Sequence, residues 1–345
     1  MRHENFLVVG GSGFVGRHLV AALAARGARV TVPTRRRERA KHLILLPTVD
    51  VVQVEQLDAR ALGSLAAGCD AVVNLAGVLH SPRARAGEEG PNHYGPAFAQ
   101  AHVELAQAVV AACRAAGAGH NRPRLLHMSA LGADPKAPSE YLRSKGIGER
   151  SALAADDLEV TVFRPSVIFG PEDRFLNLFA RLAALLPVLV LGSPEARFQP
   201  VYVGDVVRAF LAALDSDEAI GKRYDLCGPK EYTLRQLVER VCSITGRRRL
   251  VIGLPESLSY LQAWAMELLP IKLLTRDNYR SMQVPSVCRS CNGGAFPFGI
   301  QPALLETLAP SWLAPAGPRE RIAGSRERFA GPRERYAQLR LRARR

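Results

Sequence analysis

The chain has 345 residues, of which 48% are hydrophobic and 23% charged. This composition argues against bulk disorder, and the length predicts one large domain or two closely packed ones. The net charge is +14, but residues 317–345 hold ten arginines and three glutamates, and these supply half of it. The rest of the chain has no basic stripe with interleaved aromatic residues, so we expect no nucleic-acid partner.

The compartment is predicted from apolar runs and cysteines. The longest apolar stretch, Leu182 to Leu191, is too short to span a bilayer and contains Pro187. No secretory signal is readable, because a strand-like run begins almost at the start of the chain. Six cysteines over this length do not form a disulfide framework, so we expect a reducing, cytoplasmic location.

The first 165 residues alternate strand-like and helix-like patterns, which predicts a parallel sheet with helices on both faces. Beyond Pro165, glycines and prolines mix with short helical patterns, which predicts a smaller lobe. We expect strands at residues 6–9, 29–33, 49–54, 70–75, 124–129, 160–163 and 223–227. We expect helices at 14–25, 96–116 and 141–155, and near 175–186, 205–214 and 233–245. The fold class is therefore an α/β doubly wound parallel sheet with a smaller mixed C-terminal lobe.

A glycine-rich segment, Gly10-Gly-Ser-Gly13-Phe-Val-Gly16, links the first expected strand to the first helix. The glycines allow a tight turn and a close approach of the backbone to a pyrophosphate, and the N–H groups at the helix start favour its negative charge. The strand before the loop and the helix after it are the context that a Rossmann dinucleotide site requires. We expect the cofactor to bind at Gly10, Gly13, Phe14, Val15 and Gly16.

The end of the second expected strand indicates which dinucleotide binds. A site that prefers NAD places an acidic residue there to hold the ribose, whereas this chain has Pro33-Thr-Arg-Arg-Arg37. A guanidinium attracts a 2′-phosphate and stacks on adenine. We therefore expect NADP(H), with Arg35 as its ligand. NAD(H) is the alternative, in which case these arginines are a solvated helix start.

Tyr141 and Lys145 are four residues apart in an expected helix, so they lie on one helix face. A cation beside a tyrosine stabilises the phenolate and lowers its pKa, as a tyrosine acid/base requires. Ser129 ends the preceding expected strand, where strand ends line a ligand cleft. We expect these three residues to be catalytic. The alternative is an ordinary pair on a helix surface.

These motifs together resemble the extended short-chain dehydrogenases/reductases. The resemblance includes the glycine loop, Asp58, Asn74-Leu-Ala-Gly77, Ser129, Tyr141 with Lys145, and Arg164-Pro-Ser-Val-Ile-Phe-Gly170. More narrowly, several runs resemble the NADPH-binding accessory subunit of respiratory complex I and its bacterial relatives. These runs are Tyr141-Leu-Arg-Ser-Lys145, Phe169-Gly-Pro-Glu-Asp-Arg-Phe-Leu-Asn177, Gln199-Pro-Val-Tyr-Val203 with Asp205, Thr275-Arg-Asp277 and Gly299-Ile-Gln301.

The resemblance implies roles for individual residues. Ser129, Tyr141 and Lys145 are expected to face the nicotinamide, with Lys145 also bonding its ribose, and Asp58 is expected near the adenine. The same motifs add further cofactor contacts at Leu75, Ala76, Gly77, Pro165 and Val167. We assign residues 1–228 to an NAD(P)-binding Rossmann domain with an insertion around 168–200, 229–313 to the small C-terminal lobe, and 314–345 to a basic repeat tail expected to be disordered. The alternative for the tail is a contact with anionic lipid or an acidic partner.

Two functions fit this sequence. The first is an NADP(H)-dependent oxidoreductase, or an epimerase-like enzyme, acting on an unidentified small molecule with a link to quinone metabolism. The second is a non-catalytic accessory or assembly protein, in which NADPH is structural and the outer surface docks on a respiratory complex. The second function would place the protein at the inner face of the cytoplasmic membrane.

Three further features of the sequence have no expected role in catalysis. Cys288 and Cys291 form a single pair with few soft ligands nearby, so we expect no metal site and treat them as incidental. The apolar segment Ser257 to Leu269, with Trp264, is expected to pack in the core, with a membrane or partner contact as the alternative. Asp173 is expected to be solvated or to tie its loop. The alternatives are that it lines the substrate pocket with Arg174 or forms a local ion pair with it.

Overall fold

The structure, a computed structural model, describes residues 3–82, 93–117, 122–268, 274–288 and 296–314. Its centre is a seven-stranded sheet in the order β3-β2-β1-β4-β5-β6-β11, in which every neighbouring pair is parallel. The strands are β1 (Asn5–Val9), β2 (Arg29–Thr34), β3 (Val49–Gln53), β4 (Ala71–Asn74), β5 (Arg124–Met128), β6 (Val160–Pro165) and β11 (Arg223–Leu226). The strand order reverses between β1 and β4, where ligands of such folds bind.

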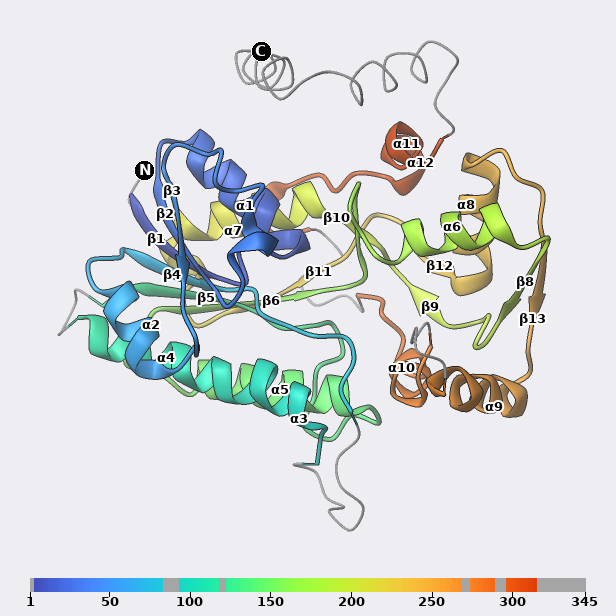
Figure 1. Cartoon of the computed structure of the whole chain (residues 1–345), viewed down its shortest axis with the longest axis horizontal. Coiled ribbons are helices and arrows are strands. Elements are labelled where there is room, and N and C mark those ends of the chain that lie inside the picture. Colours follow the sequence, from blue (N-terminus) through green and yellow to red (C-terminus); the bar gives the residue numbers. More distant parts are fainter. Residues whose placement is uncertain (1–2, 83–92, 118–121, 269–273, 289–295, 315–345) are drawn as a thin grey trace.

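Helices cover both faces of this sheet (Figure 1). Side chains of β1 alternate between the two faces: Phe6 and Val8 belong to one apolar cluster and Leu7 and Val9 to the other. The first face is covered by α1 (Phe14–Ala25), η1 (Arg37–Ala40) and α7 (Val203–Leu214). The second is covered by α2 (Ala59–Ala66), α4 (Leu105–Ala116) and α5 (Glu140–Leu153). The expected α/β doubly wound sheet is confirmed.

The expected long helix at residues 96–116 is interrupted. It consists of a short turn, α3 (Pro96–Phe98), a π-helical segment, η2 (Ala99–Glu104), and then α4. A π-helical turn holds one extra residue, and such turns are common at functional sites. Here it accompanies the burial of His102, which is only 2% exposed.

The smaller lobe has its own apolar cluster, which joins residues 169–198 to residues 232–242 and 305–313. The insertion therefore packs with the C-terminal lobe, and the domain boundaries expected from the sequence stay a prediction. Its strands are β7 (Ile168–Phe169), β8 (Val188–Leu191), β9 (Arg197–Phe198), β10 (Val201–Tyr202), β12 (Tyr232–Thr233) and β13 (Leu250–Gly253). The remaining helices are α6 (Leu176–Leu185), η4 (Asp217–Ala219), α8 (Leu234–Ile244), α9 (Glu256–Glu267), α10 (Arg276–Met282), η5 (Pro297–Gly299), α11 (Leu305–Leu308) and α12 (Pro310–Leu313).

A disulfide joins the sheet to the smaller lobe, contrary to the sequence expectation. Cys227, directly after β11, bonds to Cys288, with their Cα atoms 6.0 Å apart. The two cysteines are 61 residues apart in the chain, so spacing alone could not pair them. Treating Cys288 as incidental was wrong, and the bond removes the cysteine argument for a reducing compartment. Cys291 lies outside the described residues.

The apolar segment that was expected in the core is largely exposed. Helix α9 buries Ser259 and Ala263, whereas Leu258, Leu261 and Trp264 face outward. Leu269 and the expected tail from residue 315 onward lie outside the described residues. Within the described ranges, no helix has the length and apolar character needed to cross a bilayer.

Candidate functional site

The glycine loop lies against the loop that follows β4. Gly10 has a φ of +82°, and a Cβ atom there would lie 2.9 Å from the backbone N of Ala76. A Cβ atom on Gly16 would lie 2.4 Å from the carbonyl oxygen of Gly10. Both positions therefore require glycine. Among the described residues no side chain caps the N-terminus of α1 at Gly13, so its first N–H groups suit an anionic ligand.

Lys145 lies where three of the predicted segments meet. Its Nζ donates to the carbonyl oxygens of Ala76, at 3.2 Å, and Met128, at 3.1 Å. A Cβ atom on Gly77 would lie 3.2 Å from the same Nζ. Desolvation lowers the pKa of Lys145 to about 8, against the opposing effect of Glu149. Lys145 thus joins α5 to the loop after β4 and to the end of β5.

Tyr141 is held by aromatic side chains and titrates differently from the sequence expectation. Its ring lies edge-on to His102, with the centroids 5.5 Å apart, and 6.1 Å from the ring of Phe98. Desolvation, with a smaller effect of Asp277, raises the pKa of Tyr141 to about 12. The expectation that its pKa is lowered was wrong in direction. A phenol with this pKa is protonated at neutral pH and can act as a proton donor.

Ser129 directly follows β5 and is 3% exposed. Its backbone N–H donates to the carbonyl oxygen of Phe163 at 2.7 Å, which fixes its position. Its Oγ is buried, and no hydrogen-bond partner for it is found among the described residues. Because an unpaired buried hydroxyl is costly, this atom suits a polar group of a ligand.

The sequence interpretation missed His102. Its Nε2 accepts a hydrogen bond from the N–H of Val78 at 3.1 Å, which leaves the proton on Nδ1. Nδ1 then donates to Oγ of Ser144 at 2.8 Å, and that hydroxyl donates to the carbonyl oxygen of Tyr141 at 2.9 Å. Desolvation, followed by the charge of Lys145, lowers the pKa of His102 to about 2, so the ring is neutral. His102 therefore joins the loop after β4 to the helix of Tyr141.

A second buried histidine supports the same loop. Asn74 accepts from the N–H of Ala76 at 3.1 Å, and its Nδ2 lies 3.3 Å from Nδ1 of His127. Desolvation, with a contribution from Lys145, lowers the pKa of His127 to about 3. The ring is therefore neutral as well, and its Nδ1 can accept from the amide. No sequence pattern pointed to either histidine, because both act through segments distant in the chain.

The smaller lobe caps the helix of Tyr141. Asp277, at the start of α10, accepts from the backbone N–H of Glu140 at 2.6 Å and of Tyr141 at 3.1 Å. Ser139 caps the same helix by accepting from the N–H of Leu142 at 3.2 Å. The sequence indicated Asp277 only as part of the motif Thr275-Arg-Asp277, without a role. The structure shows that its carboxylate holds the first turn of α5.

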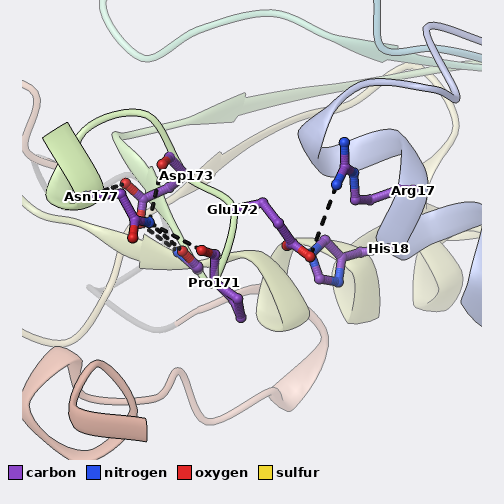
Figure 2. A network of polar contacts seen from close by, with 7 residues as sticks. Arg17, His18, Pro171, Glu172, Asp173 and Asn177 are labelled. Carbon is purple, nitrogen blue, oxygen red and sulfur yellow. Dashed lines mark hydrogen bonds and ion pairs between the residues drawn. The ribbon is translucent and has the colours of Figure 1, made fainter. Parts of the chain in front are cut away.

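The segment after β7 ties the smaller lobe to α1 (Figure 2). Glu172 lies 3.0 Å from Nε2 of His18 and 3.9 Å from Nη1 of Arg17. Asp173 accepts backbone hydrogen bonds from Gly170, Phe175, Leu176 and Asn177. Of the roles considered for Asp173, the structure shows loop tying, because its carboxylate is used by its own loop.

The other predicted cofactor residues lie at the ends of neighbouring strands. Arg35 directly follows β2 and is exposed. Asp58 caps α2 by accepting from the N–H of Ala61 at 2.8 Å. Pro165 ends β6 and accepts from the N–H of Leu131 at 3.0 Å, whereas Val167 packs against the cluster of the smaller lobe. In the part of the chain that the structure describes, no group of three or more His, Cys, Asp or Glu could hold a metal ion.

Comparison with known proteins identifies the family. Residues 6–227 match the NAD dependent epimerase/dehydratase family. The mitochondrial NADH dehydrogenase (ubiquinone) 1 alpha subcomplex subunit 9 of Mus musculus is 30% identical over 309 residues, 87% of this chain and 77% of that protein. A ceramide reductase of Caulobacter vibrioides is 33% identical over 252 residues, covering 72% of this chain and 73% of the reductase.

A solved structure with this fold is dTDP-glucose 4,6-dehydratase from Streptomyces venezuelae with NAD bound, which has a TM-score of 0.59 and 23% identity. That similarity covers 74% of this chain and 89% of the dehydratase, and it supports the fold alone. The resemblance to extended short-chain dehydrogenases/reductases and to the complex I accessory subunit is confirmed by the matches in sequence. Because the matched region runs from β1 to Cys227 and contains the glycine loop, Ser129, Tyr141 and Lys145, the chain belongs to the NAD dependent epimerase/dehydratase family.

Proposed function

We propose that this protein is an NADP(H)-dependent oxidoreductase that reduces a carbonyl group. The observation that supports this function best is the convergence on Lys145 Nζ, which binds the carbonyl oxygens of Ala76 and Met128. The loop after β4, the end of β5 and the helix of Tyr141 meet around this one cation, and the phosphate loop lies against the same loop after β4. A dinucleotide loop near a Tyr–Lys helix would hold a cofactor and a carbonyl substrate close together, which suits hydride transfer.

The residues fit a nicotinamide dinucleotide. The backbone of Gly10 to Gly16 would hold the pyrophosphate, and Asp58 would lie near the adenine. The remaining contacts would come from Leu75, Ala76, Gly77, Pro165 and Val167. The dehydratase of the same fold binds NAD. We infer NADP(H) here because Arg35 occupies the place where an acidic residue would favour NAD. When bound, the cofactor supplies the hydride.

In this proposal Tyr141 donates its phenolic proton to the carbonyl oxygen while the carbonyl carbon receives the hydride, which gives an alcohol. Ser129 orients the same oxygen through its unpaired Oγ. Lys145 would hold the cofactor ribose, and its positive charge would stabilise the phenolate of Tyr141 until that oxygen regains a proton from solvent. The raised pKa of Tyr141 favours the donor direction, because the phenol remains protonated near pH 7.

The second candidate is an accessory protein of a respiratory NADH:quinone oxidoreductase. The similarity to the mouse NADH dehydrogenase subunit favours it. The contacts of Asp277 with α5 and of Glu172 with α1 also favour it, because they join the lobes around the cofactor site. NADPH would then strengthen this connection, and the protein would lie at the inner face of the cytoplasmic membrane.

The substitution Tyr141→Phe separates the two functions. If the protein is an enzyme, loss of the phenolic proton should lower turnover about 100-fold or more, while NADPH affinity changes less than about twofold. Turnover is measured with quinones and with ketones, and the matched control is Tyr224→Phe, away from the site. Unchanged turnover would reject the catalytic role. Stoichiometric NADPH that neither exchanges nor is consumed would support the accessory function.

Cofactor preference is tested with Arg35→Asp. Placing a carboxylate beside the 2′-phosphate should weaken NADPH binding at least about tenfold more than NADH binding. Titration calorimetry with both dinucleotides measures the difference, and Arg29→Asp at the other end of β2 is the control. Equal weakening of both cofactors would refute the assignment of Arg35.

A further inference from the structure

Helix α9 has the reverse of the usual burial pattern of a surface helix. Leu258, Leu261, Trp264 and Leu268 recur at intervals of three or four residues, which places them on one face at the helix and its C-terminal boundary. They are 47%, 55%, 45% and 72% exposed, respectively. An apolar stripe on a helix ordinarily faces the core.

The inward side of α9 is occupied by small and polar groups instead. Gln262 donates to the carbonyl oxygen of Val190 at 3.1 Å, and Oγ of Ser259 accepts from the N–H of Ser193 at 3.0 Å. Ala263 is fully buried. Glu267 accepts from Arg276, so it binds α10 rather than standing on the apolar stripe. These contacts fix the rotation of the helix and keep the stripe outward.

The apolar surface continues onto the neighbouring strands. Val190 of β8 and Ile252 of β13 are register partners and are 46% and 42% exposed. Leu185 at the end of α6 is 79% exposed, and Leu250 is 61% exposed. In the described part of the chain, ten of the fourteen large exposed hydrophobic side chains lie between Leu185 and Leu268. Figure 1 shows α6, β8, β13 and α9 together at one end of the molecule, away from the seven-stranded sheet.

Arginines border this surface. Arg249 donates from Nε to the carbonyl oxygen of Ala183 at 2.8 Å, which places residues 247–249 beside the end of α6. Arg248 and Arg181, the latter on α6 itself, are exposed. Exposed leucines and a tryptophan beside arginines are the composition of an interfacial membrane-binding surface. The positive charge selects anionic lipid headgroups.

We propose that the outer face of the smaller lobe, formed by the end of α6, β8, β13 and α9, docks on an anionic lipid bilayer. The apolar side chains enter the boundary between headgroups and acyl chains, and the arginines contact phosphates. This docking does not depend on turnover at Tyr141. It would bring the smaller lobe to the membrane surface at which the accessory function would place the protein.

The test uses Trp264 as the reporter in the full chain. Trp312→Phe leaves Trp264 as the only tryptophan, because the sequence contains two. The protein is mixed with vesicles of phosphatidylglycerol and phosphatidylcholine whose acyl chains are brominated. We expect quenching of the Trp264 fluorescence with these vesicles, and partitioning about tenfold weaker with phosphatidylcholine alone.

Paired variants assign the contact to this face. Leu258→Glu with Leu261→Glu should weaken partitioning at least about tenfold, whereas Leu45→Glu with Leu304→Glu, exposed elsewhere, should not. Arg181→Gln with Arg248→Gln should weaken binding to anionic vesicles, and Arg29→Gln with Arg150→Gln is the control. NADPH binding and turnover should be unchanged in all of these variants, which keeps this test separate from the proposed function.

Three results would overturn the proposal. Vesicle binding without quenching of Trp264 would place the contact on another part of the chain, such as the arginine-rich sequence 317–345. Equal quenching of Trp264 by neutral and anionic vesicles would reject the proposed preference for anionic lipids. Absence of vesicle binding, together with self-association that Leu258→Glu and Leu261→Glu abolish, would assign the surface to a second copy of the chain.

Discussion

Helices α5 and α9 both depart from the usual distribution of side chains, but in opposite directions. Helix α5 buries Ser144, Lys145 and Glu149. Helix α9 exposes Leu258, Leu261 and Trp264. Hydropathy alone would therefore predict the wrong burial for these side chains in both helices.

The difference lies in whether distant segments supply partners. In α5 each buried polar group is paired: Ser144 with His102, Lys145 with two carbonyl oxygens, and Glu149 with Arg164. Burial of polar groups is tolerated when they are hydrogen-bonded. In α9 no described segment covers Leu258 or Leu261, so these side chains are available for a partner. Buried polarity thus indicates an internal site, and exposed apolarity indicates an external contact.

The largest effect on stability should come from removing Arg164, the ion-pair partner of Glu149 in α5. Arg164 donates to Glu149 from Nε at 2.8 Å and from Nη2 at 2.6 Å, and the side chain of Glu149 is 2% exposed. Arg164→Met should lower the free energy of unfolding by about 3 kcal/mol, because the carboxylate stays buried with only the longer contact to Arg223. Urea denaturation measures the loss. The double variant Arg164→Met with Glu149→Leu should recover most of it, and a single-variant loss below about 1 kcal/mol would contradict the argument.

The next largest effect is the change of the free energy of unfolding with pH that Lys145 causes. Its pKa is lowered to about 8 in the folded chain, below that of an exposed lysine in the unfolded chain. Above pH 8 the unfolded chain therefore binds more protons than the folded one, so the free energy of unfolding should rise with pH. Relative to Lys145→Met, the wild type should gain at most about 2 kcal/mol between pH 7.5 and 9.5.

The control for this measurement is Lys136→Met, since Lys136 is exposed. The stability of the Lys136→Met variant should change with pH as that of the wild type does across the same range. The interval ends at pH 9.5 because the raised pKa of Tyr141 changes stability in the opposite direction above about pH 10. A pH slope that Lys145→Met leaves unaltered would show that this lysine is not desolvated.

The smallest effect on stability is expected for a substitution on the exposed face of α9. Leu261→Gln should change the free energy of unfolding by less than about 0.5 kcal/mol, because Leu261 is 55% exposed. The matched change on α5, Leu142→Gln, should cost more than about 2 kcal/mol, since Leu142 is 4% exposed. Thermal unfolding distinguishes the two. Equal losses would mean that Leu261 is covered in solution.

Much of the sheet and part of the candidate site could be predicted because their signals are local. Each expected strand formed with ends within two residues of the prediction, and α1 has the expected bounds. The glycine loop was predictable since its turn needs glycine at Gly10 and Gly16. The spacing of Tyr141 and Lys145 placed both on one helix. His102 and the capping role of Asp277 were not predictable, because each acts on backbone groups far along the chain.

By itself, the sequence determined the chain order of the seven sheet strands, the phosphate loop and the face shared by Tyr141 and Lys145, since each depends on residues within one or two helical turns, one strand or one loop. Tertiary structure alone decided the raised pKa of Tyr141, the bond between Cys227 and Cys288 and the outward face of α9. The physical reason is the same in all three cases. The desolvation of a side chain, the pairing of two cysteines and the burial of a helix face all depend on which distant segments lie against them. A linear sequence pattern does not contain that information.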